Sequence, residues 1–324
     1  MKIGLVSTWG ERCGVSEYTA TLADELFKKY EVNLKIVANY PKDCQVIDDA
    51  PNYIRQLFHC PFMTNQTTAD VDEIVEFFKD RDVVHFQFET SIYHPSWFST
   101  LLERLKANKT KIILTMHSWG IWHNFNQSLV DRFVTHEPIY SPDISTVISM
   151  PVKDYFDVGD GIIPNYNQVC SFGLGRNRDE DIIAALKDVP NVSYVTHYGS
   201  TGKWLDELDL IEKIKESWII SLIYPQVGAR TSSRAVTVAM GCDRPILCTP
   251  TNWFAHVIDC PNLYICKSVD DIRENIKYLI NPDNRDKIKD DIENMKIWIQ
   301  QNERSLDQVI DKHLELYKYV INKE

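Results

Sequence analysis

The feature that most constrains the fold is an alternation between short apolar runs and longer amphipathic stretches along most of the 324 residues. Such alternation is typical of βα units, whose strands pair in parallel sheets. In the first half, strands are expected at residues 2–6, 33–38, 83–88, 111–115 and 144–148. Helices are expected between them, and the clearest is the one in which Val15, Tyr18, Leu22 and Leu26 recur at helical spacing.

A second series of the same kind follows residues 162–168, where a proline and a polar cluster interrupt the pattern. We take this interruption as the joint between two domains. Beyond it, strands are expected at 169–173, 192–196, 218–224, 245–248 and 263–266, and helices at 179–186, 206–216, 232–240 and 269–280. The prediction is therefore two Rossmann-like α/β domains, residues 1–164 and 165–304. A C-terminal helix over 305–324 is a candidate to pack back on the first domain.

Composition narrows the classes of partner. The chain carries 35 basic and 46 acidic residues, for a formal charge of -11. This charge disfavours non-specific electrostatic binding to nucleic acid or to an anionic membrane. Its eight cysteines include no CxxC pair and no zinc-type spacing, so reduced intracellular thiols and no metal are expected. The chain has no apolar run near the roughly 20 residues of a bilayer span, nor a signal-peptide pattern, so the expected location is cytoplasmic.

The first predicted strand leads through Gly10 and Gly14 directly into the helix that begins near Val15. In an open parallel sheet this crossing lies at the carboxyl edge, where ligands bind and free helix amides favour an anion. Gly14 would let a ligand approach the backbone, although a plain tight turn explains the glycine equally well. The segment is not a GxGxxG fingerprint, so a nicotinamide or flavin dehydrogenase gains little support.

Two further strands of the first half end in polar groups. Glu89 follows the strand at 83–88, and His117 follows the strand at 111–115. A histidine at this edge can hydrogen-bond a bound hydroxyl, and a carboxylate can bind sugar hydroxyls or accept a proton. The alternative is that His117 is a structural core residue and that Glu89 caps the next helix.

The second half places hydroxyls, amides and arginines at one predicted helix start. The residues concerned are Arg230, Thr231, Ser232, Ser233 and Arg234. Helix amides and guanidinium groups both match phosphate oxygens, so this segment predicts a diphosphate site. An ordinary Ser/Thr helix cap beside surface arginines is the alternative. A similar arrangement follows an earlier strand, with Gly173, Arg176 and Arg178. The two segments together suggest a polyanionic ligand despite the net negative charge of the chain.

Taken in order, these segments resemble the retaining glycosyltransferases of the GT-B architecture, specifically the family four (glycosyl transferases group 1) type. The resemblance runs through nearly the whole chain and is carried by residues 9–18, 83–89, 115–118, 163–165, 171–173 and 239–246. The last of these, from Ala239 to Ile246, is similar to the family's Glu-Ala-Met-Ala-Cys-Gly-x-Pro-Val. No single match is decisive; the order and spacing carry the resemblance.

The resemblance implies two domains that face each other across a cleft, with C-terminal helices. It also implies a reaction that transfers a sugar with retention of its anomeric configuration and without a metal ion. The donor would be a UDP-sugar or GDP-sugar, and the acceptor a glycan, glycoprotein or lipid-linked sugar. His117, Glu89 and Arg230 would serve the reaction. The donor and acceptor would be bound by Gly14, Val15, Gly173, Arg176, Arg178, Thr231, Ser232, Ser233 and Arg234.

The chain departs from the family at one informative place. That group carries two glutamates separated by seven residues, and the aligned positions here are Arg230 and Val238. The usual phosphate-clamp lysine has Arg178, Arg176 or Lys203 as its candidate counterparts. The chain is thus expected to be a divergent member. Two alternatives stay open: a sugar-nucleotide epimerase or hydrolase on the same fold, and a non-catalytic nucleotide-sugar-binding protein.

Overall fold

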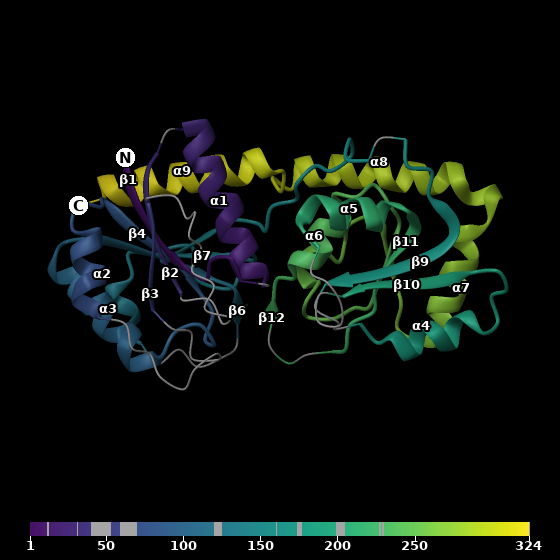
Figure 1. Ribbon diagram of the computed structural model, residues 1–324, viewed down its shortest axis with the longest axis horizontal. Coiled ribbons are helices and arrows are strands. Elements are labelled where there is room, and N and C mark those ends of the chain that lie inside the picture. The colour runs from purple at the N-terminus through teal and green to yellow at the C-terminus, as the bar shows by residue number, and fades with distance from the viewer. Residues whose placement is uncertain are drawn as a thin grey trace. The chain divides into compact units, whose positions relative to one another are not determined.

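The computed structural model describes residues 1–11, 13–30, 32–39, 53–58, 70–119, 125–159, 161–173, 177–198, 205–226, 228 and 230–323. The chain forms two compact units, each with its own core. Unit 1 consists of Met1–Ser149 together with Val309–Glu324, and unit 2 consists of Met150–Gln308 (Figure 1). The chain therefore crosses between the units twice.

Unit 1 is built on a seven-stranded parallel sheet with the order β3-β2-β1-β4-β5-β7-β8. Its strands are β1 (Lys2–Ser7), β2 (Asn33–Asn39), β3 (Ile54–Phe58), β4 (Val83–Phe88), β5 (Lys111–Met116), β7 (Arg132–Thr135) and β8 (Ser145–Val147). The predicted strands at 2–6, 33–38, 83–88, 111–115 and 144–148 are confirmed to within one residue at each end. β3 and β7 were not expected, because each has polar residues that break the apolar run.

The helices of unit 1 are α1 (Gly14–Tyr30), α2 (Val71–Phe78), α3 (Pro95–Ala107) and, from Val309 onward, α9 (Leu306–Asn322). Because side chains alternate along a strand, Val84, Phe86 and Phe88 of β4 join one apolar core with α2 and α3, which lie side by side in Figure 1. The alternate residue His85 contacts Tyr317 of α9 instead. The two faces of the sheet therefore differ in kind, one apolar and one carrying buried polar groups.

Gly4 in the middle of β1 allows α2 to pack closely on the sheet. A Cβ at this position would lie 2.7 Å from the ring of Phe78, which is fully buried, and 3.1 Å from Val84. We therefore expect Gly4→Ala to lower the free energy of unfolding by about 1–3 kcal/mol, since the ring has no room to move. Urea unfolding of the whole protein measures the change. A urea midpoint equal to that of the wild type would contradict the packing argument.

Unit 2 has a five-stranded parallel sheet with the order β10-β9-β11-β13-β14. Its strands are β9 (Asn165–Gly173), β10 (Ser193–Tyr198), β11 (Ser217–Leu222), β13 (Ile246–Cys248) and β14 (Leu263–Ile265). Its helices are α4 (Asp179–Leu186), α5 (Glu207–Lys215), α6 (Arg234–Met240), α7 (Val269–Ile280) and α8 (Arg285–Gln301). The prediction of two Rossmann-like α/β halves with C-terminal helices is confirmed.

The largest difference from the sequence-based expectation in unit 2 is at the start of β9. The polar cluster from Asn165 to Gln168 is not a break in the pattern but the first half of β9. Its side chains alternate between exposed and half-buried, and Gln168 Oε1 accepts a hydrogen bond of 2.9 Å from Ser217 Oγ on β11. Polar residues are tolerated here because this end of the strand lies near the surface of the unit.

In the part of the chain that is described, no helix combines the length and the apolar character needed to cross a membrane.

Candidate active site

In unit 1, the loop between β1 and α1 lies at the carboxyl edge of the sheet and is held by side chains. Asn39 accepts the amide hydrogen of Trp9 at 3.0 Å and donates to Glu11 Oε1 at 2.9 Å. Gly10 in this loop has a left-handed conformation, with φ of 69°. Gly14 is the first residue of α1, and Val15 is half-buried against the core. Asn39 thus fixes Trp9 and Glu11 at the edge where parallel sheets bind ligands.

Glu89 lies directly after β4 and links two neighbouring strand ends. Its Oε1 accepts hydrogen bonds from the amide and the hydroxyl of Thr90, at 3.1 and 3.2 Å, and its Oε2 accepts one from Ser118 Oγ. The side chain is half-buried. Its carboxylate is therefore held in one orientation at the sheet edge and keeps a route to solvent.

His117, one residue beyond β5, is only 4% exposed. Its amide donates to the carbonyl of Phe88, and its Nε2 lies 2.9 Å from Gln87 Oε1. Burial, with a smaller contribution from His136, lowers the pKa of His117 well below its usual range. The ring is therefore neutral at pH 7. If Nε2 carries the proton that Gln87 accepts, Nδ1 is the acceptor atom of the ring.

His117 belongs to a buried group of aromatic and imidazole rings that the sequence did not reveal. Tyr18 lies edge-on to His117 and His136, with ring centres 5.2 and 5.7 Å away, and its hydroxyl is 2.8 Å from His313 Nε2. His85 contacts the hydroxyls of Tyr317 and Thr115, at 2.8 and 2.7 Å. The sequence signals were the placement of His313 on the inner stripe of the last helix and of His85 and Gln87 on one side of the strand at 83–88.

In unit 2, Gly173 ends β9 with φ of 99°, a conformation that favours glycine. A Cβ there would lie 3.8 Å from the hydroxyl of Tyr224. Asn177 and Arg178, where the described chain resumes, bind next to the end of β11: the Arg178 amide donates to the carbonyl of Ile223, and Asn177 Oδ1 accepts the amide of Ile223. The Arg178 guanidinium is 46% exposed and pairs with Asp181. It is a solvent-accessible cation beside the first turn of α4.

A second group that sequence analysis missed lies on the same edge. The hydroxyls of Tyr194 and Tyr198 both donate to Asp179 Oδ1, at 2.6 and 2.5 Å, and the Tyr194 oxygen also lies 2.8 Å from Ser171 Oγ. Burial, followed by the bond to Asp179, raises the pKa of Tyr194 above its ordinary value. Both phenols remain protonated donors. The two tyrosines recur at even spacing along β10, which was the available signal.

The segment before α6 holds the predicted hydroxyl cluster. Thr231 and Ser232 are half-buried, and Ser233 is buried, with its amide bonded to the carbonyl of Trp253 at 3.2 Å. Asn252 donates to the carbonyl of Gly228 at 3.4 Å. Two hydroxyl side chains, those of Thr231 and Ser232, thus lie at the surface next to the start of α6.

Arg234 occupies a different setting from its neighbours. It is 7% exposed, and its guanidinium bonds to the carbonyl of Pro151 and to Glu207 Oε1, both at 3.2 Å. Glu207 also accepts from Lys153 and Tyr155, at 2.5 and 2.7 Å. The charge of Arg234 is therefore balanced inside unit 2, where it joins α6 to α5.

Several predicted positions lie outside the described residues: Arg176 and Lys203 entirely, and Arg230 in its side chain. Within the ranges that are described, no group of three or more His, Cys, Asp and Glu side chains could hold a metal ion. The described candidates fall into two sets. The carboxyl edge of the unit 1 sheet carries Gly14, Val15, Glu89 and His117. The carboxyl edge of the unit 2 sheet carries Gly173, Arg178, Thr231, Ser232 and Ser233.

No protein-family model and no curated protein sequence matches the chain. Among solved structures it is similar to Anabaena HepE in complex with UDP-glucose, with a TM-score of 0.69 and 12% identity over 98% of this chain and 100% of that one. Sucrose-phosphate synthase from Thermosynechococcus elongatus has a TM-score of 0.67, 12% identity and 98% coverage of both chains. The pneumococcal O-GlcNAc transferase GtfA, in complex with UDP and GlcNAc, has a TM-score of 0.62 and 9% identity, over 100% of this chain and 99% of that one. The chain therefore has the fold of GT-B glycosyltransferases: two Rossmann-like domains with C-terminal helices.

Proposed function

We propose that the protein is a glycosyltransferase that moves a sugar from a nucleotide-diphosphate sugar to an acceptor hydroxyl. The observation that carries the proposal is the likeness in fold over 98% of this chain and 100% of HepE, which was solved with UDP and with UDP-glucose. Likeness over both units matters because the two units together supply the two sets of strand-end residues. The donor would be a UDP-sugar or a GDP-sugar, as the resemblance implies.

The donor diphosphate would bind at the carboxyl edge of the unit 2 sheet. Gly173 leaves room beside its backbone, Arg178 offers an accessible guanidinium, and Thr231 and Ser232 offer hydroxyls. Arginine suits this role because its planar donors match phosphate oxygens. We assign the same role to Arg176 and Arg230. Arg234 would position α6 rather than bind the diphosphate itself, because its charge already balances Glu207.

The acceptor would bind at the carboxyl edge of the unit 1 sheet, near Gly14 and Val15. In the reaction, the bond between the anomeric carbon and the diphosphate oxygen breaks, and the acceptor oxygen bonds to that carbon. Glu89 is half-buried and held by Thr90 and Ser118, so it is suited to take the acceptor's proton. Neutral His117 would orient the donor sugar by hydrogen bonding. Arginines and helix amides would stabilise the charge of the departing nucleotide diphosphate.

A thermal-shift screen against UDP-, GDP-, ADP- and TDP-sugars tests the donor class. A ligand at a hundred times its dissociation constant stabilises the folded state by about 2.7 kcal/mol. Arg178→Gln should weaken binding about tenfold, which is about 1.4 kcal/mol. Lys213→Gln, which removes an exposed cation on α5 of the same unit, should leave affinity unchanged. Absence of any response from the wild-type protein to all four nucleotide sugars would contradict the proposal.

Retention and independence from metal ions are the finer parts of the proposal. We expect turnover to persist in excess EDTA, and the transferred sugar to keep the anomeric configuration of the donor when the product is followed by NMR. Loss of turnover in EDTA that is restored by Mg²⁺ or Mn²⁺ would contradict the first part. An inverted anomeric signal in the initial product would contradict the second.

A sugar-nucleotide epimerase is the second candidate, because the fold also matches the putative UDP-N-acetylglucosamine 2-epimerase from Listeria monocytogenes, with a TM-score of 0.54 and 13% identity. Incubation with the nucleotide sugar alone separates the two activities. Isomerised or hydrolysed sugar formed without an acceptor would favour the second candidate.

A further inference from the structure

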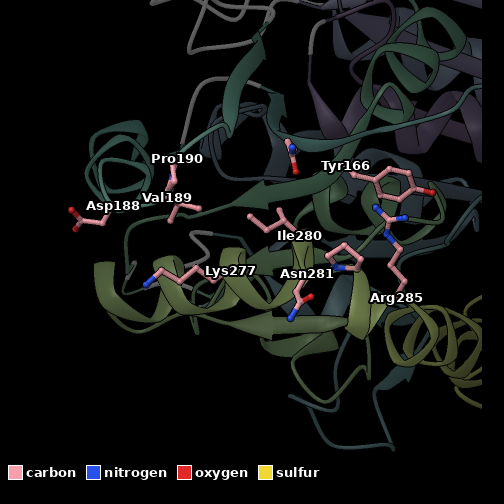
Figure 2. A pocket seen from close by; sticks show the side chains of 10 residues that line it. Tyr166, Asp188, Val189, Pro190, Lys277, Ile280, Asn281 and Arg285 are labelled. Carbon is pink, nitrogen blue, oxygen red and sulfur yellow. The ribbon is translucent and has the colours of Figure 1, made fainter.

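A pocket lies at the edge of unit 2 opposite to the strand ends described above. It is lined by the start of β9, the turn after α4, the end of α7 and the start of α8 (Figure 2). Because β9 and β10 are parallel and both begin here, this is the amino edge of the sheet, away from Gly173 and Ser232. We call it the amino-edge pocket. Its volume of about 590 Å³ falls within the range of small-ligand sites.

The walls of the amino-edge pocket are mainly apolar, with two amide side chains among them. Val189, Pro190, Ile280 and Pro282 supply the apolar surface. Among described residues, the side-chain amide of Asn167 has no hydrogen-bond partner, and Asn281 uses only its Oδ1, which accepts the amide of Asp283 at 3.0 Å. A ligand with both C–H faces and hydroxyl groups would match this combination.

The charge of the pocket is positive, in a chain whose net charge is -11. Arg285 lies over the ring of Tyr166 at 3.9 Å, and no carboxylate among the residues that the structure describes pairs with it. Lys277 pairs only with exposed Glu274, at 2.9 Å. The one carboxylate in the lining, Asp188, is already paired with Arg273 at 3.2 Å. A bound anion would therefore meet one cation without a described carboxylate partner, Arg285, and a second, Lys277, whose partner Glu274 is exposed to solvent.

Arg285 also lies at a helix start, where a cation is unfavourable and where Asp286 supplies the only acidic side chain of the first turn. It is the first residue of α8, where the helix dipole presents partial positive charge, and Asn284 makes no side-chain cap there. Asp283 and Asp286 flank it in sequence but do not line the pocket. In Figure 2, Lys277 and Arg285 lie at opposite ends of the lining, with Ile280 between them. The volume of the pocket, about 590 Å³, suits a ring-sized molecule rather than a simple ion.

We infer that the amino-edge pocket binds a carboxylate-bearing sugar residue, a hexuronate, within the acceptor or product glycan. The carboxylate would pair with Arg285 or Lys277, the hydroxyls would bond to Asn167 and Asn281, and the ring would pack on Ile280 and Val189. The choice of a saccharide rests on the proposed function; the preference for an anion rests on the pocket alone. Such a site would hold an acidic glycan on unit 2 away from the reacting groups.

Isothermal titration calorimetry with cellobiouronic acid and with neutral cellobiose tests this inference. We expect the acidic disaccharide to bind at least tenfold more tightly than the neutral one, and Arg285→Gln to weaken it about tenfold. Asn167→Ala, at an exposed strand position, should weaken both sugars. Lys289→Gln removes an exposed cation of α8 outside the lining and should change neither.

Equal affinity for the two disaccharides, or an Arg285→Gln protein that binds as tightly as the wild type, would overturn the inference. So would acetate binding as tightly as the acidic disaccharide, since that would define a general anion site. Arg285→Gln should leave the thermal shift by UDP-glucose unchanged. A protein that binds the acidic disaccharide but no nucleotide sugar would therefore refute the proposed function and retain this inference, and the reverse result would do the opposite.

Discussion

Lowering the pH from 7.5 to 5.5 is expected to remove about 4 kcal/mol from the stability of unit 1, because three of the four buried histidines among its described residues, His85, His117 and His313, are held in neutral form. His85 and His313 are fully buried and His117 nearly so. Burial is the main cause that lowers the pKa of His313 to about 3 and those of His85 and His117 well below their usual range. Proximity of other imidazoles adds to the effect in each case.

The sign follows from which state takes up protons. Below a pH of about 6.5, the unfolded chain protonates these histidines and the folded unit does not, so stability is complete above that pH and falls as the pH decreases. Each histidine contributes about 1.4 kcal/mol at pH 5.5. The partners of His85 and His313 are hydroxyl and amide groups from Tyr317, Thr115, Gln87 and Tyr18, which give an imidazolium no countercharge.

Urea unfolding between pH 5.5 and 7.5 measures this dependence. His313→Gln keeps a polar group for Tyr18 but cannot titrate. The slope of unfolding free energy against pH gives the number of protons taken up on unfolding, and this number should be about one lower in the variant near pH 5.5. His94→Gln is the matched control, because His94 is exposed in the folded protein. If wild-type stability is the same at both ends of the pH range, the histidines are not neutral and buried as described.

Replacement of Lys215 by methionine is expected to destabilise unit 2 by about 3 kcal/mol or more. Lys215 ends α5 and is 4% exposed, and its ammonium donates to the carbonyls of Tyr155, Phe156 and Val158 at 2.9, 2.7 and 2.9 Å. Methionine fills similar space but donates nothing. Three carbonyl groups of a turn would then lose their partner, and the turn would lose its anchor to α5.

The neighbouring Lys213 offers a close control for that substitution. It lies on the same helix, is half-exposed and pairs with Glu216. Lys213→Met removes the same charge without exposing any backbone group, so the urea midpoint should stay at the wild-type value. Equal effects of the two substitutions would mean that loss of charge, rather than loss of the three hydrogen bonds, governs the result.

Much of the fold could be predicted because helices and buried strands have local signatures. The helices at 179–186 and 269–280 begin and end where the pattern places them, and Ser268 caps the second by accepting the amide of Asp271. β3 was missed because Arg55 and Gln56 interrupt its apolar run at the edge of the sheet. β7 was missed because it has four residues and begins with Arg132.

The candidate site was predictable only in part. The positions of Glu89, His117, Gly173 and Ser232 at strand or helix ends follow from the βα pattern. Whether a charged side chain is accessible or already paired does not follow from the βα pattern. Arg234 lies next to Ser233 in sequence, yet its guanidinium is occupied by Glu207 and by the carbonyl of Pro151, which are 27 and 83 residues away.

By itself, the sequence determined that this chain forms two parallel α/β sheets whose strand ends carry glycines, hydroxyls and arginines. Those properties depend on periodicities of two to four residues, which a local stretch of chain encodes. Only the tertiary structure decided which cations are accessible, which are balanced internally, and that His313 of the last helix meets Tyr18 of the first. Burial and ion pairing join residues that are distant along the chain, so they arise only when the elements pack.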